Sequence, residues 1–334
     1  MNSLPNFTKI FDEFKKISDK EKGKPIVVSI LGQTGTGKSS LVNALFGTYF
    51  ETNDVHPCTA KLQSHKEFTK SGQEIIFNDL PGIGESSDAD SQYLQEYCRV
   101  IRESNVVLWA IHSDSRSTSF DKSSIKKIIT LLGIPYYHEF LNKLVFVLTK
   151  SDLIFPDPWI FAHTEREFKI FPQQKTLELL RKKSEFVFEQ LLSDYSYEIT
   201  SEVVNDCKFN SQIDGFHILD EMIQFKGVLT AEKLAILVQQ YPKYESVFER
   251  FHNIYMPVAC SSYFRFNLDY LLYVIVHRLD FSGLMRFRPF IDEYNVREIE
   301  TNRISQLSNL ITLNKSKGEV IFSLGDYVKK KGLI

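Results

Sequence analysis

Residues 25–47 read PIVVSILGQTGTGKSSLVNALFG, and this stretch decides the fold. An apolar, β-branched run comes first and predicts a buried strand, and an amphipathic pattern that ends at Gly47 predicts a helix. Between them, from Gly32 to Ser39, lies the pattern G-x-x-x-x-G-K-[ST]. A strand, a glycine-rich loop and a helix in this order are the context in which that pattern indicates a phosphate-binding loop.

The residue types of this loop fit a nucleotide phosphate. Glycines permit backbone angles that are closed to residues with a Cβ, so successive N–H groups can turn toward one anion. The start of the following helix adds unpaired N–H groups and a partial positive charge. We expect Lys38 to reach the β- and γ-phosphates and the Ser39 hydroxyl to hold Mg²⁺. The residues expected to contact the nucleotide here are Gly32, Thr34, Gly35, Thr36, Gly37, Lys38, Ser39 and Ser40.

The composition is that of a globular protein without a strong overall charge. The chain has 334 residues, with 40 basic and 42 acidic side chains and a formal net charge of -2. No whole-protein field would attract nucleic acid or anionic lipid. The four cysteines are widely spread and the start of the chain does not read as a signal segment, so we expect reduced thiols and a cytoplasmic protein. The longest apolar stretch, residues 270–276, is far shorter than the ~20 residues of a membrane-spanning helix.

The order of the expected elements predicts an α/β fold with a doubly wound, mostly parallel sheet, whose ligands bind at the carboxyl ends of the strands. An amphipathic, Phe-rich pattern also predicts a helix within residues 1–24, packed on the chain's own domain or, alternatively, on a partner or a membrane surface. Residues 153–171 read as a loop insertion with some helix. The further strands are expected at 62–68, 74–80, 105–112, 143–148 and 197–200, and the further helices at 90–104, 120–132, 175–192 and 215–224.

Two segments after the phosphate loop are expected to complete a magnesium and γ-phosphate site. Asp79 closes a predicted strand, and an aspartate in this place beside a phosphate loop can hold Mg²⁺ through water. Gly82, three residues later, leaves room for backbone to approach the γ-phosphate. Thr59 lies in the polar stretch 49–61 and could give its hydroxyl to Mg²⁺ and its N–H to the γ-phosphate; an ordinary loop threonine is the alternative.

A second informative motif, TKSD, begins at Thr149 and follows the strand expected at 143–148. Asp152 could accept hydrogen bonds from the ring N–H and the exocyclic amine of guanine, while the stem of Lys150 covers the base. Adenine lacks that pair of donors, so a carboxylate here would select against ATP. After the last expected strand, Ser201 would offer its backbone N–H to the guanine carbonyl.

Taken together, these motifs resemble a GTP-binding G domain of the Era-like kind, over about residues 25–225. The resemblance implies GTP or GDP and Mg²⁺ as ligands, with Thr59 as the switch I threonine, DLPG as the switch II motif and TKSD as the guanine motif. The phrases GKSSLVNALFG and DLPGIGES also look like prophage-associated bacterial GTPases and immunity-related, dynamin-like GTPases. The domains expected are the N-terminal helix in 1–24, the G domain in 25–226 and a mainly helical partner or effector region in 227–334.

Three departures from the family pattern bear on the reaction. Ile83 stands where Ras-like enzymes place a catalytic glutamine, and an isoleucine cannot orient water by hydrogen bonding. Thr149 replaces the more usual asparagine, and Gly35 replaces the asparagine of potassium-stimulated relatives, which argues against a potassium-dependent mechanism. The resemblance therefore implies slow GTP hydrolysis, stimulated by a partner or by a homodimer formed through the nucleotide face. The residues expected at the reacting phosphate are Lys38, Thr59 and Gly82.

The region 227–334 decides what such a switch acts upon, and here several interpretations stay open. Aromatic side chains interleaved with arginine suit single-stranded nucleic acid, but they are more often a Phe-rich core with a solvated rim. The basic run 329–331 is expected to be solvated, or to touch phosphate or anionic lipid. The alternatives are an RNA- or ribosome-associated assembly GTPase, a dynamin-like or defence GTPase that self-associates or binds membrane, a GTP-dependent interaction module and, more distantly, an ATP-dependent P-loop kinase.

Overall fold

The structure is a computed structural model in which residues 24–48, 50, 52, 62–68, 72–82, 87–154, 159–163, 168–204, 215–219, 222–279, 310–314 and 319–323 are described. Its centre is a six-stranded sheet in the order β11-β5-β4-β1-β3-β2, in which only β2 runs antiparallel to its neighbour. The central strands are buried along their whole length, as parallel strands covered on both faces are. The strands are β1 (Ile26–Gly32), β2 (Gln63–Phe68), β3 (Glu74–Asp79), β4 (Val106–His112), β5 (Leu144–Thr149) and β11 (Val258–Ala259).

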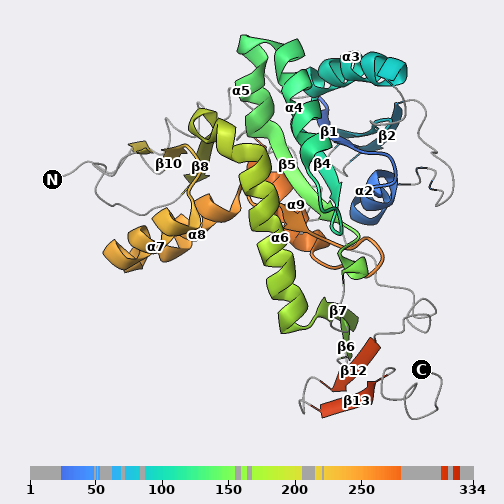
Figure 1. Ribbon diagram of the computed structural model, residues 1–334, viewed down its shortest axis with the longest axis vertical. Helices are drawn as coiled ribbons and strands as arrows, with labels where there is room; N and C mark the ends of the chain where they lie inside the picture. Colours follow the sequence, from blue (N-terminus) through green and yellow to red (C-terminus); the bar gives the residue numbers. More distant parts are fainter. Residues whose placement is uncertain are drawn as a thin grey trace.

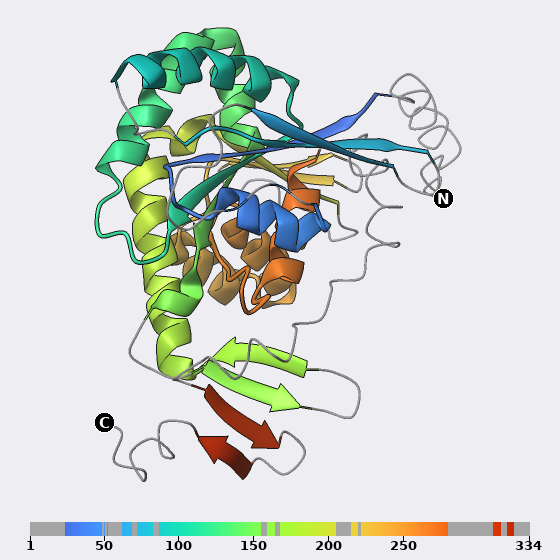
Figure 2. The ribbon, with the colours of Figure 1, turned by 90° about the vertical axis from the view of Figure 1, so that its right-hand side faces the viewer.

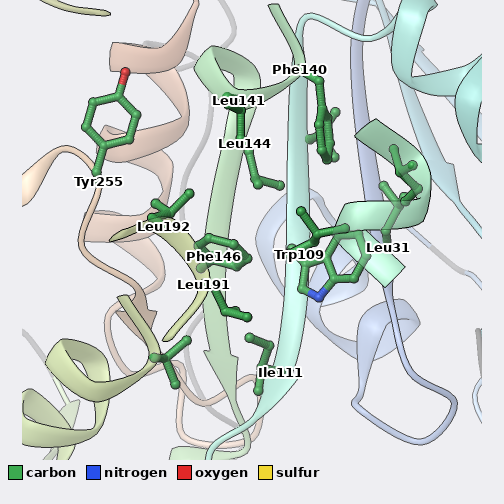
Figure 3. Packing of buried hydrophobic residues seen from close by; sticks show 14 of the residues in the cluster. Leu31, Trp109, Ile111, Phe140, Leu141, Leu144, Phe146, Leu191, Leu192 and Tyr255 are labelled. Carbon is green, nitrogen blue, oxygen red and sulfur yellow. The ribbon is translucent and has the colours of Figure 1, made fainter. Parts of the chain in front are cut away.

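Helices cover both faces of this sheet (Figure 1). One core joins the sheet to α3, α4, α5 and α6, and Figure 3 shows its Trp109 and Phe146 packed between strands and helices. The other core joins the sheet to α2 and α9. This arrangement confirms the doubly wound, mostly parallel α/β fold. The helices are α2 (Lys38–Phe46), α3 (Ser87–Glu103), α4 (Ser119–Leu132), α5 (Ile134–Lys143), α6 (Gln174–Leu192) and α9 (Leu268–Arg278).

An inserted unit lies between α6 and β11 in the chain. It consists of a three-stranded sheet in the order β8-β10-β9, which packs on two helices through a core centred on Phe216, Phe225 and Phe251. The unit lies beside the main sheet in Figure 1. Its elements are η2 (Ser193–Glu198), β8 (Thr200–Val204), β9 (Phe216–Leu219), β10 (Met222–Lys226), α7 (Ala231–Gln240), η3 (Pro242–Tyr244) and α8 (Glu245–Asn253).

A third sheet, of four strands in the order β13-β12-β6-β7, lies at the end of α6 that is away from the inserted unit (Figure 2). It brings together a hairpin that follows the TKSD motif and a hairpin near the end of the chain, because β12 pairs in parallel with β6. The strands are β6 (Trp159–His163), β7 (Phe168–Pro172), β12 (Leu310–Asn314) and β13 (Glu319–Ser323), and a short helix, η1 (Ser151–Leu153), precedes the first of them.

Most of the elements expected before residue 193 are present, and several later ones differ. The predicted final strand of the main sheet, 197–200, is wrong, because its place beside β5 is taken by β11. The predicted helix 215–224 is wrong, because β9 and β10 lie there, and the expected loop 153–171 contains β6 and β7. The main sheet and its core continue past residue 226 through β11 and α9, so the boundary predicted there does not coincide with a boundary of the core. The helices α7, α8 and α9 agree with a helical C-terminal region, to which β11, β12 and β13 add strands.

The helix predicted within residues 1–24 lies outside the described residues, except for Lys24. Among the residues that are described, no helix combines the length and the apolar character needed to cross a bilayer.

Candidate functional site

Most of the predicted site residues that the structure describes gather at the carboxyl edge of the main sheet, where the loops after β1, β3 and β5 lie. The phosphate loop runs from Gly32 to the start of α2 at Lys38. Its turn into the helix depends on Gly37, which has φ of 83° and caps the helix in the left-handed region. A residue with a Cβ would be strained in that conformation.

The phosphate loop is held together by its own side chains. Lys38 Nζ donates to the carbonyl of Gly32 over 3.3 Å and to the carbonyl of Gln33 over 3.1 Å. The hydroxyl of Thr36 donates to the same Gln33 carbonyl over 2.8 Å. The Lys38 ammonium group is therefore buried on the loop, while Thr34, Gly35 and Ser40 are exposed. A phosphate bound in the loop would meet this ammonium group directly.

Two oxygen donors predicted for Mg²⁺ are in contact. Ser39 Oγ donates a hydrogen bond to Asp79 Oδ2, and the Asp79 side chain is fully buried at the end of β3. The neighbouring backbone of Leu80 donates to the carbonyl of Ile30 over 3.2 Å, which fixes the end of β3 against β1. A hydroxyl and a carboxylate are the oxygen ligands that Mg²⁺ prefers, so this donor set fits the ion. Thr59, the third predicted ligand, lies outside the described residues.

The switch II motif lies directly against the phosphate loop. A Cβ placed on Gly82 would come within 2.6 Å of both N and Cα of Thr34, so only glycine fits there. The preceding residue, Pro81, is held by its carbonyl, which accepts a hydrogen bond from the buried Tyr97 hydroxyl of α3. The position of Gly82 thus depends on the phosphate loop on one side and on α3 on the other. Ile83 lies outside the described residues.

The TKSD motif is tied to the phosphate loop by two side chains. Thr149 Oγ1 donates to the carbonyl of Thr36 over 2.5 Å and to that of Ile111 over 3.1 Å, so the threonine hydroxyl links β5, β4 and the phosphate loop. Lys150 takes a left-handed conformation, with φ of 54°, and its Cε lies 3.4 Å from a Cβ built on Gly37. The motif therefore places its lysine stem beside the phosphate loop, with Asp152 partly exposed two residues further on.

The loop beside TKSD comes from a part of the chain that the sequence did not indicate. Cys260 follows β11, donates through its N–H to the carbonyl of Leu148 over 2.8 Å and accepts from the N–H of Ser151 over 3.1 Å. Burial raises the pKa of the Cys260 thiol, and the nearby Asp152 raises it further. Ser201 instead lies on β8 in the three-stranded sheet, so the prediction that it follows the final strand of the main sheet is wrong. The sequence feature that could have pointed to the Cys260 loop was the run of small residues from Ala259 to Ser262, which follows Val258.

His112 is a second neighbour of the TKSD motif that the sequence did not single out. It ends β4, opposite Thr149 in the parallel register. Burial lowers its pKa and the charge of Lys150 lowers it further, while Asp114 and Asp152 act in the opposite direction. The imidazole is therefore biased toward its neutral form beside the proposed base-binding motif.

Comparison with known proteins matches the part of the chain that carries these motifs. Residues 27–150 match the profile of the family described as "50S ribosome-binding GTPase". The uncharacterized protein YfjP of Escherichia coli is 36% identical over 128 residues, which cover 38% of this chain and 42% of YfjP. GTPase Era of Deinococcus radiodurans is 25% identical over 194 residues, which cover 54% of this chain and 62% of Era. The chain thus spans less than two thirds of the length of either relative.

Among solved structures, Aquifex aeolicus Era bound to GDP.AlF4- aligns with a TM-score of 0.41 and 17% identity, over 77% of this chain and 57% of that one. The sequence profile, the Era relative and the phosphate and TKSD motifs agree over the same residues. Residues 27–150 form a P-loop GTPase domain of the Era-like type.

Proposed function

We propose that this chain is a switch protein that binds GTP and hydrolyses it to GDP and phosphate with Mg²⁺. The observation that carries the proposal is the bond from Thr149 Oγ1 to the carbonyl of Thr36, together with the Lys150 stem beside Gly37. These contacts hold the motif that is proposed to select guanine against the phosphate loop. A base and its phosphates can then bind at one edge of the sheet.

In this proposal the phosphate loop supplies most of the charge stabilisation. Lys38 leaves the carbonyls of Gly32 and Gln33 and bonds to the phosphate, where it offsets the negative charge that develops as the γ-phosphate departs. The loop N–H groups act on the same oxygens. Ser39 and Asp79 would hold Mg²⁺, which neutralises charge on the β- and γ-phosphates when bound.

Gly82 is proposed to report the γ-phosphate to the rest of the chain. Its backbone already lies against Thr34, so a phosphate oxygen entering the loop would meet the Gly82 N–H or displace it. Thr59 is proposed to contribute from switch I, and Ile83 cannot itself orient the attacking water by hydrogen bonding. We therefore infer that a homodimer formed through the nucleotide face, or another partner, supplies the group that orients it.

For the base, we propose that Asp152 selects guanine and that the turn after Cys260 takes the role first expected for Ser201. The hydrogen bond between Ser151 and Cys260 supports this, because it holds that turn beside the TKSD motif. A guanine carbonyl could then accept from the turn's backbone while Asp152 accepts from the base N–H groups.

A ribosome- or RNA-associated role is the second candidate, favoured by the family description of the profile that matches residues 27–150. Three of the aromatic residues that are interleaved with arginine pack within the protein instead of forming an exposed stacking platform. Phe264 is buried, Tyr263 and Phe266 pack with it around Trp159, and Arg265 bonds to the end of α2. An RNA contact would have to use residues other than these three, and a defence or dynamin-like role stands beside it as a further alternative.

The test is titration of the purified protein with fluorescent GTP, GDP and ATP analogues in the presence of Mg²⁺, with phosphate release followed at several protein concentrations. The Asp152→Ala variant should lose guanine-selective binding. Asp194→Ala is the matched control, because Asp194 is an exposed aspartate of η2 that belongs to none of the predicted nucleotide motifs and pairs with Lys122. Equal affinity for ATP and GTP would overturn the proposal, and turnover that does not change with concentration would count against the homodimer.

A further inference from the structure

Gln33, the first residue after the opening glycine of the phosphate loop, has polar groups that bond in two directions. Its carbonyl accepts from Lys38 Nζ over 3.1 Å, from the Thr36 hydroxyl over 2.8 Å and from the Thr36 N–H over 3.4 Å. Its side chain points away from the loop and donates from Nε2 to Asp121 Oδ2 over 3.1 Å. The carbonyl of Gln33 therefore accepts the hydrogen bonds within the phosphate loop, while its side chain is held by Asp121 outside the loop.

The anchor is a buried carboxylate. Asp121 lies in the first turn of α4 with 1% of its surface exposed, and its second oxygen accepts from Trp109 Nε1 over 2.8 Å. Trp109 is itself fully buried in β4, so its indole N–H is fixed. Burial raises the pKa of Asp121, while the bonds from Trp109 and Gln33 oppose that shift. A buried carboxylate costs free energy even when both oxygens are bonded, so hydrophobic packing alone does not account for this one.

The phosphate-loop backbone next to Gln33 also lies against the switch II motif. Thr34, the neighbour of Gln33, is the residue whose N and Cα would lie 2.6 Å from a Cβ on Gly82. A change in the position of Gln33 would therefore be passed to the backbone of the switch II motif.

Nucleotide binding raises the importance of the anchor. In the present structure Lys38 Nζ closes the loop by bonding to the Gly32 and Gln33 carbonyls. A phosphate that takes up this ammonium group removes those bonds. The Gln33 carbonyl then keeps its bonds from Thr36, and the Gln33 side chain keeps its bond to Asp121.

We propose that Asp121 is a positioning residue of the nucleotide site, which acts through Gln33 to hold the phosphate loop in its binding conformation. This inference rests on the proposed function, because it concerns the affinity of the same loop for GTP. Asp121 touches no nucleotide in this proposal, and Trp109 fixes the carboxylate from behind.

The first test compares Gln33→Ala, Asp121→Asn and the double variant in binding of a non-hydrolysable GTP analogue. Asparagine keeps the size of Asp121, but it is neutral, and its amide nitrogen replaces one of the two accepting oxygens, so neither donor keeps a bond to a charged acceptor. A bond to a buried charged acceptor corresponds to roughly a ten-fold change in affinity or more, so each single variant should bind at least about ten-fold more weakly. The double variant should bind no more weakly than the weaker single variant, because both changes act on the same contact between residues 33 and 121. Gln240→Ala, at an exposed position on α7, is the matched control.

The second test separates positioning from a purely structural role. The chain has two tryptophans, so ¹⁵N-labelled protein should give two indole N–H signals, and Trp159→Phe identifies that of Trp109. We expect the GTP analogue to shift the Trp109 signal in the wild type and to leave it unshifted in Gln33→Ala. That variant keeps the Trp109–Asp121 pair, so its packing in the core is unaffected.

The outcomes distinguish this proposal from the one it rests on. A wild-type protein that does not bind the GTP analogue would defeat the proposed function. If the wild-type protein binds the analogue, two results would overturn only the positioning role of Asp121. One is a Gln33→Ala variant whose affinity equals that of the wild type, and the other is a Gln33→Ala variant whose Trp109 signal still shifts as in the wild type.

Discussion

The N–H of Ser151 donates to the carbonyl of Cys260 over 3.1 Å, and this bond joins the TKSD motif to a loop that lies far away in the sequence. The N–H of Cys260 in turn bonds to Leu148 at the end of β5. The inserted unit of β8, β9, β10, α7 and α8 separates the two partners along the chain without disturbing their pairing. The sixth strand of the main sheet is therefore supplied from beyond the insertion, and the loop that follows it lies beside the TKSD motif.

The first prediction contrasts two serines. Ser261 Oγ is buried and accepts from the N–H of Phe264 over 3.0 Å, so Ser261→Ala leaves that donor unsatisfied at a cost of about 1–3 kcal/mol. The turn beside Asp152 should loosen, and GTP affinity should fall by roughly three- to ten-fold. Ser201 Oγ is buried without a hydrogen-bond partner among the described residues, so Ser201→Ala should leave affinity unchanged. Nucleotide titration of both variants checks this, and an unchanged affinity in Ser261→Ala would argue against a role of the turn after Cys260.

The second prediction concerns the bond that joins the same loop to the phosphate-loop helix. Arg265 Nη2 donates to the carbonyl of Ala44, in the last turn of α2, over 2.8 Å, and a cation at a helix C-terminus is favourable. Arg265 also has φ of 53°, a left-handed conformation that strains any residue with a Cβ. Arg265→Ala should lower the free energy of unfolding by about 1–3 kcal/mol. Arg265→Gly should lower it by about 1 kcal/mol less, because glycine relieves the strain. Denaturant titration measures both, and equal losses would mean that the loop does not hold this conformation.

The sequence was sufficient to predict the strands and the site where a buried apolar segment is followed directly by a nucleotide-binding motif. β1, β4 and β5 are mostly apolar, and the phosphate and TKSD motifs begin at the ends of β1 and β5, so both the strands and the site could be predicted. β11 has only two residues, which is too short for any periodicity to appear.

The other errors have similar physical causes. The sequence GFHILDEMIQ spaces its apolar residues as a helix would, yet β9 and β10 bury Phe216 and Ile223 as strands in the small core. β6 is stabilised by pairing with β12, whose residues come from near the end of the chain. Such non-local pairing leaves no trace in a local pattern, and neither does the side-chain bond between Gln33 and Asp121.

The third prediction tests the contact between switch and phosphate loop. In Gly82→Ala the new Cβ would come within 2.6 Å of the Thr34 backbone, so the switch II segment must move. GTP-analogue affinity should fall by at least about ten-fold while GDP affinity changes little, because only the γ-phosphate approaches Gly82. Thr34→Gly should not rescue the variant, since the clash includes the N and Cα of Thr34.

The control for Gly82→Ala is Gly47→Ala, at the C-terminal end of α2. Gly47 has φ of 66° and no atom within 4 Å of an added Cβ, so this change strains the backbone away from the switch. It should reduce stability and leave the ratio of GTP to GDP affinity unchanged. An unaltered ratio in Gly82→Ala as well would argue against Gly82 as the γ-phosphate sensor.

The last prediction follows from the burial of Asp121. Burial raises its pKa in the folded state, so between the ordinary aspartate pKa of about 3.9 and the folded value the native protein holds more protons than the unfolded chain. The free energy of unfolding must then fall as pH rises through that range, and the contribution becomes constant above it. Asp121→Asn does not titrate, so the stability of the wild type relative to this variant should decline with rising pH and then level off. Denaturant titrations of both proteins at a series of pH values measure the difference. A relative stability that increases with pH would mean that the bonds from Trp109 and Gln33 outweigh burial and lower the pKa instead.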